Sequence, residues 1–238
     1  MEKERLQKIL SRCGFGSRRD CEKLIKAGRV EINNKTAILG DKADVSQDHI
    51  LVDKNPLQKP AKSNIYIAFN KPRYVLSETK KSDERKVIPE FVTMDDNLFI
   101  VGRLDYDSEG LILITNNGEV ANRLTHPRYE HEKEYLVLSQ RKPDVKQIET
   151  WKRGVVLENG YRTLPADIFN LSQTKNGYWF TTILKEGKKR QIREMGKTIG
   201  LPIKRIIRKR IGPIELGSLK PGKWRFLNKK EISILENL

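Results

Sequence analysis

"VGRLDYDSEGLILIT", residues 101–115, places three carboxylates at alternate positions directly before a run of aliphatic side chains. The aliphatic run is typical of a buried strand, and the apolar residues 98–102 predict another strand just before the loop. Asp105 therefore falls at an edge of the core, where a carboxylate is partly desolvated and needs a positive partner to stay ionised. We interpret the other two carboxylates, Asp107 and Glu109, as parts of a solvated turn.

A metal site is the alternative use of these carboxylates. The spacing Asp105-x-Asp107-x-Glu109-Gly110 begins like a calcium-binding loop, but such a loop needs a glutamate at its twelfth residue, where this chain has Asn116. The aliphatic residues that follow suit a strand rather than a loop around a cation. The histidines at 126 and 131 are separated by a proline and have no cysteine nearby, which disfavours zinc. We expect no metal.

Outward from this stretch, strand-like runs outnumber helical patterns. The expected strands are 65–69, 98–102, 111–115, 134–138, 178–185 and 203–215. The expected helices are 118–125, 143–153 and 190–199. Because strands and helices do not alternate regularly, we predict an α+β fold with a largely antiparallel mixed sheet flanked by helices and loops.

The first 53 residues predict a separate small α/β unit. Leu6, Ile9, Leu10 and Cys13 form one apolar helix face, and Ser17 caps a second helix that ends near Gly28. Strands are expected at 29–33 and 49–53. The polar, proline-containing segment 54–64 is typical of a linker. We therefore place a boundary near residue 62, which gives domains 1–62 and 63–238.

Charge and composition indicate a polyanionic partner. The chain has 47 Lys and Arg against 31 Asp and Glu, a net charge of +16. Residues 1–30 carry +5 of this charge and residues 185–210 carry +9. Charge gathered into two patches is typical of surfaces that follow phosphates, so we expect nucleic acid to bind. The chain has no run near the roughly 18 apolar residues that cross a bilayer and no hydrophobic signal core. With both cysteines expected to be reduced, we predict a soluble, cytoplasmic protein that does not bind a membrane.

The two basic patches supply the candidate nucleic-acid contacts. The predicted RNA-binding residues are Arg5, Lys8, Arg12, Arg18, Arg19 and Lys23 in the first patch and Lys188, Lys189 and Arg190 in the second. In the second patch, Arg193 flanks an apolar stripe that begins at Ile192, so its guanidinium can reach an internal cleft. We predict that Arg193 is the positive partner of Asp105.

Two stretches of sequence resemble known families. "LSRCGFGSRRDCEKLIKAGRVEINN", residues 10–34, resembles the S-four RNA-binding module. "FNKPRYVL" (69–76), "VGRLDYDSEGLILITNNGEVANRLTHP" (101–127), "HEKEYLV" (131–137) and "EGKKRQIREM" (186–195) occur in the order seen in ribosomal RNA pseudouridine synthases of the small-subunit type, which also carry this module.

The resemblance implies roles for individual residues. Asp105 is the expected catalytic carboxylate and Tyr135 packs against the target base; the alternative for Tyr135 is an aromatic residue of a core strand. Arg193 pairs with Asp105, Ile192 lines the pocket, and Arg103 contacts RNA near the flipped nucleotide.

The lysine–proline pair begins a further element of the resemblance, in which Lys71 is expected to bind substrate. The chain departs from the family pattern at Tyr74, where the family usually has glycine, so we expect this turn to be built differently. Asn117 replaces a common aspartate, outside the proposed chemistry.

The resemblance implies isomerisation of a uridine in ribosomal RNA to pseudouridine. This reaction breaks an N-glycosidic bond, rotates the base and rejoins it through carbon five, so it requires no cofactor. One ionised carboxylate, an arginine and an aromatic face meet its needs. Whether Asp105 attacks the base, attacks the ribose or removes a proton stays open. The expected partner is ribosomal RNA, free or in pre-ribosomal particles, and the expected state is a monomer. The alternatives are a non-enzymatic ribosome-assembly factor and a metal-dependent nuclease.

Overall fold

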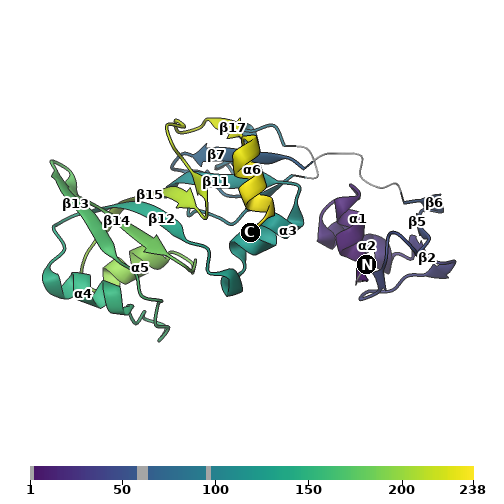
Figure 1. The fold of residues 1–238 in the computed structure, drawn as a ribbon, viewed down its shortest axis with the longest axis horizontal. Helices are drawn as coiled ribbons and strands as arrows, with labels where there is room; N and C mark the ends of the chain where they lie inside the picture. The colour runs from purple at the N-terminus through teal and green to yellow at the C-terminus, as the bar shows by residue number, and fades with distance from the viewer. Residues whose placement is uncertain (1–2, 58–63, 95–97) are drawn as a thin grey trace. The chain divides into compact units, whose positions relative to one another are not determined.

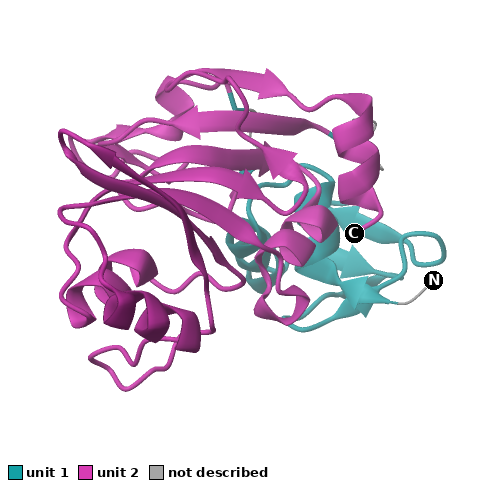
Figure 2. Cartoon of the chain, turned by 60° about the vertical axis from the view of Figure 1, so that its left-hand side comes forward, with its two compact units in different colours: residues 1–64, 94–99 teal, residues 65–93, 100–238 magenta. Residues whose placement is uncertain are grey.

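The computed structural model describes residues 3–57, 64–94 and 98–238 and divides into two compact units (Figure 2). The first contains residues 1–64 and 94–99, and the second contains residues 65–93 and 100–238. The predicted boundary near residue 62 lies outside the described residues, so that boundary stays a prediction.

The first unit begins with two helices, α1 (Leu6–Arg12) and α2 (Arg18–Lys26). The hydroxyl of Ser17 accepts a hydrogen bond from the amide of Asp20 at 3.3 Å, which confirms the predicted cap of α2. Gly28 follows this helix with φ +68°, the left-handed conformation that glycine adopts at low cost. Apolar residues of both helices form one buried cluster, in which Cys21 is fully buried and Cys13 packs at the margin as a second free cysteine.

Short strands complete this unit. A sheet in the order β3 (Lys35–Thr36), β2 (Val30–Ile32), β5 (Ile50–Val52) and β6 (Asn55–Pro56) contains the two predicted strands. A second pair joins β1 (Glu4–Arg5) to β4 (Lys42–Ala43). Val30, Ile50 and Val52 point into the same cluster as the helices, so the sheet and the helix pair share one core.

The second unit is built on a mixed sheet of nine strands within the described residues. Its main path is β13 (Ile168–Thr174), β14 (Gly177–Leu184), β12 (Lys133–Ser139), β15 (Ile203–Ile211), β11 (Glu109–Thr115), β7 (Tyr66–Lys71) and β17 (Trp224–Phe226). Beside it, β10 (Phe99–Val101) pairs with β11, and β16 (Ile214–Glu215) pairs with β15. Along the path only β11 and β15 run parallel. The predicted α+β class with a largely antiparallel mixed sheet is confirmed.

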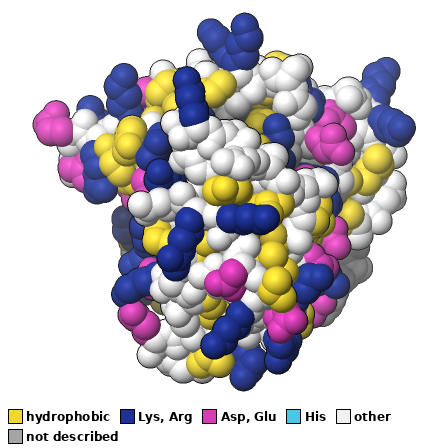
Figure 3. All heavy atoms as spheres, turned by 90° about the vertical axis from the view of Figure 1, so that its left-hand side faces the viewer, with side chains coloured by type: hydrophobic (Ala, Val, Ile, Leu, Met, Phe, Trp, Pro, Cys, Tyr) yellow, Lys and Arg dark blue, Asp and Glu magenta, His cyan; other side chains and the backbone are white. Residues whose placement is uncertain are grey.

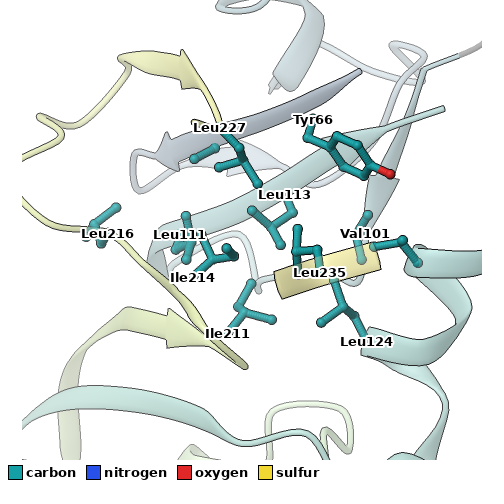
Figure 4. Packing of buried hydrophobic residues seen from close by; sticks show 12 residues of the cluster. Tyr66, Val101, Leu111, Leu113, Leu124, Ile211, Ile214, Leu216, Leu227 and Leu235 are labelled. Carbon is teal, nitrogen blue, oxygen red and sulfur yellow. The ribbon is translucent and has the colours of Figure 1, made fainter. Parts of the chain in front are cut away.

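Helices pack at both ends of this sheet (Figure 1). The helices α3 (Gly118–Thr125) and α6 (Lys229–Glu236) lie at the β7–β11 end, where Leu124 and Leu235 pack with Leu111 and Leu113 (Figure 4). The helices α4 (Val145–Arg153) and α5 (Gln191–Thr198) lie at the β13–β14 end. Shorter elements are η1 (Ile88–Glu90), η2 (Pro127–Tyr129), β8 (Val75–Leu76) and β9 (Lys86–Val87).

The predicted strand 203–215 is wrong in its continuity. Gly212 takes φ +49° and breaks it into β15 and β16, which pair as a hairpin. The strands β13 and β17 and the helix α6 were not predicted. β13 is exposed over most of its length, so it lacks the apolar alternation that marks a half-buried strand.

The parallel contact between β11 and β15 depends on Gly110. Gly110 has φ +111° and lies opposite Arg208 in the register. A Cβ atom on Gly110 would lie 2.4 Å from the backbone oxygen of Arg208, so only glycine allows the strands to approach this closely. This approach brings β15 against the start of β11, directly after the carboxylate loop.

No helix in the described ranges is long and apolar enough to cross a membrane.

Candidate active site

Asp105 lies in the loop that joins β10 to β11, and hydrogen bonds hold this loop on both sides of it. The hydroxyl of Ser77 donates to the carbonyl of Leu104 at 2.8 Å and accepts from the amide of Leu104 at 3.0 Å. The amide of Ser108 donates to the carbonyl of Asp105 at 3.1 Å. Because the neighbouring backbone is fixed, the position of the Asp105 side chain is restricted.

Arg208 supports the same loop, and its role was not predicted from the sequence. Its Nη1 donates to the carbonyl of Arg103 at 3.3 Å, and its Nε donates to the carbonyl of Leu111 at 2.7 Å. Arg208 is only 3% exposed, although it belongs to a basic run that suggests a solvated face. The sequence pattern that could have indicated this burial is the period of two along the strand, because Ile206 and Arg208 point to the same buried side.

The carboxylate of Asp105 is half-buried and, within the part of the chain that the structure describes, makes no hydrogen bond or ion pair. Its charge still acts on two neighbouring cations. Burial lowers the pKa of both Lys71 and Arg193, and the negative charge of Asp105 opposes that change in each. Among the described residues, Asp105 is therefore a carboxylate without an ion-pair partner, near two cations.

The predicted direct pair between Asp105 and Arg193 is wrong. Arg193 Nη2 lies 3.1 Å from Asp107 Oδ2 and donates to the backbone carbonyl of Asp107 at 3.2 Å. Its Nη1 donates to the carbonyl of Ile203 at 3.2 Å. The ion-pair partner of Arg193 differs from the prediction because the residue pattern places Arg193 near the loop but does not determine which of the loop's alternating carboxylates faces α5.

The interpretation of Asp107 and Glu109 as parts of a solvated turn is also wrong. Asp107 lies between Arg193 and Arg190, whose Nη1 is 3.3 Å from Asp107 Oδ1. Glu109 is 5% exposed and forms a two-point ion pair with Arg205, in which the second contact, Nη2 to Oε2, is 3.0 Å. Both carboxylates therefore bind the loop and the start of β11 to α5 and β15.

Lys71 is fully buried at the end of β7. Its Nζ donates to the carbonyls of Pro72 at 3.0 Å and Val75 at 2.8 Å, so it fixes the turn that follows. Burial lowers the pKa of Lys71 to about 8, although Glu109 and Asp105 favour its charged form. This arrangement makes Lys71 a support of the turn, and its contact with substrate stays a prediction.

Tyr135 and Ile192 both lie inside the second unit. Tyr135 is 7% exposed on β12 and faces Arg208 of β15 in the register, in a row that continues to Gly110. Ile192 is 5% exposed on α5, one residue before Arg193. The roles of Tyr135 and Ile192 at the target base stay predictions.

The residues of the second basic patch differ in their exposure and in their ion pairs. Lys188 and Lys189 are exposed, and Lys188 Nζ lies 4.5 Å from the ring centroid of Tyr161. Arg190 precedes α5 with φ +54° and pairs with Asp107, while Arg103 is exposed. On the face of the molecule that carries β13, β14 and α4, Lys and Arg side chains are spread widely with fewer acidic ones among them (Figure 3). Such a surface suits a phosphate backbone.

The first basic patch lies on α1 and α2 and partly pairs with its own carboxylates. Lys8 and Arg12 both contact Glu4, at 2.9 and 3.0 Å, and Lys23 contacts Asp20 at 3.0 Å. Arg5, Arg18 and Arg19 are exposed and, over the described ranges, form no ion pair. These three are the residues of the patch whose charge is least compensated.

Several buried polar atoms around the loop have no hydrogen-bond partner among the residues that the structure describes. They are Arg73 Nε, Ser108 Oγ, Arg193 Nε and Arg208 Nη2. Since buried polar groups are almost always satisfied, a cluster of unsatisfied ones indicates a place where a ligand or water binds. Across residues 3–57, 64–94 and 98–238 there is no group of three or more His, Cys, Asp and Glu side chains placed to hold a metal.

Comparisons with known proteins agree on one family. A family model described as RNA pseudouridylate synthase matches residues 65–197, and a model of the S4 domain matches residues 4–39. An RNA pseudouridine synthase of Aquifex aeolicus is 40% identical over 99% of this chain and 94% of its own length. The ribosomal large subunit pseudouridine synthase B of Bacillus subtilis is 35% identical over 99% and 96%.

A solved structure supports the same assignment. The crystal structure of a pseudouridylate synthase superposes with a TM-score of 0.69 at 26% identity, over 97% of this chain and 99% of that one. The fold and the matched segments define an isomerase that acts on RNA. The chain belongs to the RNA pseudouridylate synthase family and carries an S4 domain at its N-terminal end.

Proposed function

We propose that this protein converts a specific uridine of large-subunit ribosomal RNA to pseudouridine, with Asp105 as the catalytic carboxylate. The choice of RNA rests on relatives named ribosomal large subunit pseudouridine synthase B, including that of Bacillus subtilis. The RNA is bound free or within a pre-ribosomal particle, by a monomer located in the cytoplasm.

The observation that carries the choice of Asp105 is the difference in pairing among the three loop carboxylates. Asp107 is paired with two arginines and Glu109 with Arg205. In the described structure Asp105 has no ion pair or hydrogen bond through its carboxylate. A carboxylate that must contact the uridine in the reaction has to be free of structural partners, and Asp105 meets this condition.

The surrounding residues suit the chemistry. Lys71 and Arg193 are cations near Asp105, and its negative charge acts on the pKa of each of them. Tyr135 offers an aromatic face for a base taken out of its stack, and Ile192 an apolar contact. The S4 domain and the exposed Lys188 and Lys189 hold the RNA through its phosphates.

Mapping pseudouridine in a defined RNA tests the proposal. The protein is incubated with an unmodified large-subunit ribosomal RNA transcript in the presence of a chelator, and pseudouridine is mapped at each position. We expect one or a few modified uridines without added cofactor or metal. An assembly factor would bind the RNA and leave every uridine unchanged, and a nuclease would require the metal and cut the chain.

The variant Asp105→Asn tests the catalytic residue. It should form no pseudouridine while its RNA affinity stays within a few-fold, because one amide replaces one carboxylate among many phosphate contacts. The matched control is Asp167→Asn, at an aspartate whose side chain is 73% exposed. The control should keep full activity, and turnover by Asp105→Asn would reject the assignment of this residue.

A further inference from the structure

Tyr74 occupies a strained position in the turn after β7. Its φ is +62°, a left-handed conformation that is unfavourable for a bulky residue and easy for glycine. The backbone of this turn therefore has the conformation that glycine favours, although residue 74 is a tyrosine. The sequence predicts that the turn is built differently from the family pattern, and the difference that the structure shows at this position is the tyrosine side chain.

The surroundings force this conformation. Lys71 Nζ binds the carbonyls of Pro72 and Val75, one on each side of the strained part of the turn. The amide of Tyr74 donates to the carbonyl of Tyr106 at 2.6 Å. A residue held in this way against its own preference is typical of functional sites.

The ring of Tyr74 forms a surface together with that of Tyr106. Their centroids are 5.6 Å apart with an interplanar angle of 62°. The guanidinium of Arg73 lies 4.9 Å from the centroid of Tyr74, and that of Arg85 lies 5.4 Å from the centroid of Tyr106. Tyr106 directly follows Asp105 in the chain. An aromatic pair flanked by cations therefore lies in the loop that carries the proposed catalytic carboxylate.

The exposure of Tyr74 argues against a role in the core. The residue is 54% exposed, so much of its apolar area stays in water. A ring in this setting gives little packing in return for the backbone strain. Exposed aromatic rings beside arginines are what proteins use to stack the bases of single-stranded RNA while cations meet the phosphates.

Exposure distinguishes Tyr74 from Tyr135, the residue proposed to meet the target base. Tyr135, assigned to the target uridine, is buried, whereas Tyr74 lies at the surface and cannot enclose a base. Arg85 is already paired with Asp83. Arg73 has no ion pair in the described part of the chain, so its charge is available to a phosphate next to the stacked base.

We infer that Tyr74 and Tyr106 form a stacking platform for an unpaired nucleobase that neighbours the target uridine in the substrate RNA. The inference rests on the proposed function and adds a determinant of which RNA loop is accepted. The preferred substrate then has an unpaired base next to the modified uridine.

The variant Tyr74→Gly tests the platform without straining the fold, because glycine accepts φ +62°. We expect its affinity for the large-subunit RNA transcript to fall on the order of ten-fold, as when a stacked base loses its aromatic partner. Its melting temperature should be no lower than that of the wild type. Tyr74→Phe keeps the ring and should bind like the wild type. The matched control is Phe226→Ala, at a residue that is 61% exposed and belongs to another aromatic pair, and it should leave the RNA affinity unchanged.

Abasic RNA identifies the base. An abasic nucleotide placed beside the mapped uridine should weaken binding by the wild type, and on that RNA the loss caused by Tyr74→Gly should disappear. The platform is overturned if Tyr74→Gly binds the transcript like the wild type, or if its loss is the same on RNA abasic at either neighbour. A lower melting temperature with unchanged RNA affinity would show a structural brace instead. A wild type that forms no pseudouridine would reject the proposed function, while the RNA affinities of the wild type and Tyr74→Gly would still decide whether the two rings bind RNA.

Discussion

The guanidinium of Arg193 holds Asp107 by its carboxylate, at 3.1 Å, and by its backbone carbonyl, at 3.2 Å. The same guanidinium donates to the carbonyl of Ile203 at the start of β15. One cation thus connects α5, β15 and the loop that carries Asp105. Arg193 therefore contacts the loop at Asp107, two residues after Asp105, and we expect it to position Asp105 through the backbone of the loop.

Arg193→Met is expected to raise the activation free energy of pseudouridine formation by about 1–3 kcal/mol. This is less than the roughly 3–5 kcal/mol lost when a fully buried ion pair is broken, because Asp107 is partly exposed. Arg193→Lys should be intermediate, since it keeps the charge and loses the fork. Single-turnover rates of these variants, of Asp107→Asn and of the double variant Arg193→Met/Asp107→Asn form a cycle. If the two residues act as one clamp, the losses are less than additive. Additive losses would show that Arg193 acts independently of Asp107.

Glu109→Gln is expected to lower the free energy of unfolding by about 1–2 kcal/mol, because Glu109 is buried whereas its partner Arg205 can turn toward water. Urea unfolding measures the loss. The matched control is Glu158→Gln, whose partner is Lys197 and whose side chain is 67% exposed, where about 0–1 kcal/mol is expected. Equal effects of the two substitutions would contradict the structural role of Glu109.

Local patterns in the sequence were enough to place most helices of the catalytic unit. The predicted helix 118–125 matches α3, because Asn117 caps it by accepting hydrogen bonds from the amides of Glu119 and Val120 at 3.0 and 3.2 Å. Capping and apolar period are properties of neighbouring residues, so they can be read along the chain. The same holds for the strands β7 and β12, whose apolar runs are short and continuous.

The pairing of the site could not be predicted in the same way. Arg193 is 86 positions from Asp107, and Arg205 is 96 positions from Glu109. Alternating carboxylates before a strand fit a solvated turn when no partner is nearby in the chain. The fold brings Arg193 to Asp107 from α5 and Arg205 to Glu109 from β15. The family resemblance implied that Arg193 pairs with Asp105, whereas the structure pairs Arg193 with Asp107. The catalytic role of Asp105 stays a prediction.

Arg18→Ala combined with Arg19→Ala is expected to weaken RNA binding mainly through salt-dependent interactions. The two side chains are exposed and form no ion pair in the described structure, so each is free to meet a phosphate. The slope of log affinity against log salt should become shallower by about 0.7–0.9 for each phosphate that the protein no longer neutralises. Arg29→Ala is the control, because Arg29 is already neutralised by Asp53 and should change the slope less. An unchanged slope in the double variant would place the RNA elsewhere on the first unit.

Lys71 gives the protein a pH dependence of stability that can be measured without RNA. Burial lowers the pKa of Lys71 to about 8 in the folded protein, from 10.5 for an ordinary lysine. Below pH 8 both the folded and unfolded states carry the proton, so Lys71 adds no pH dependence there. Between about pH 8 and 10.5 the unfolded state binds more protons than the folded state, and stability therefore rises with pH.

The comparison of wild type with Lys71→Met isolates this effect, because the titration of all other groups is shared by both proteins. The free energy of unfolding of the wild type relative to the variant should be constant from about pH 7 to 7.5. It should then increase by at most about 1.4 kcal/mol per pH unit up to pH 10. Urea unfolding across this range measures the difference, and Lys152→Met, at a lysine whose side chain is 51% exposed, should show no such rise. If the difference in free energy of unfolding between wild type and Lys71→Met stays constant up to pH 10, Lys71 keeps an ordinary pKa. Its ammonium group would then be solvated, and burial would not determine the charge of the lysine near Asp105.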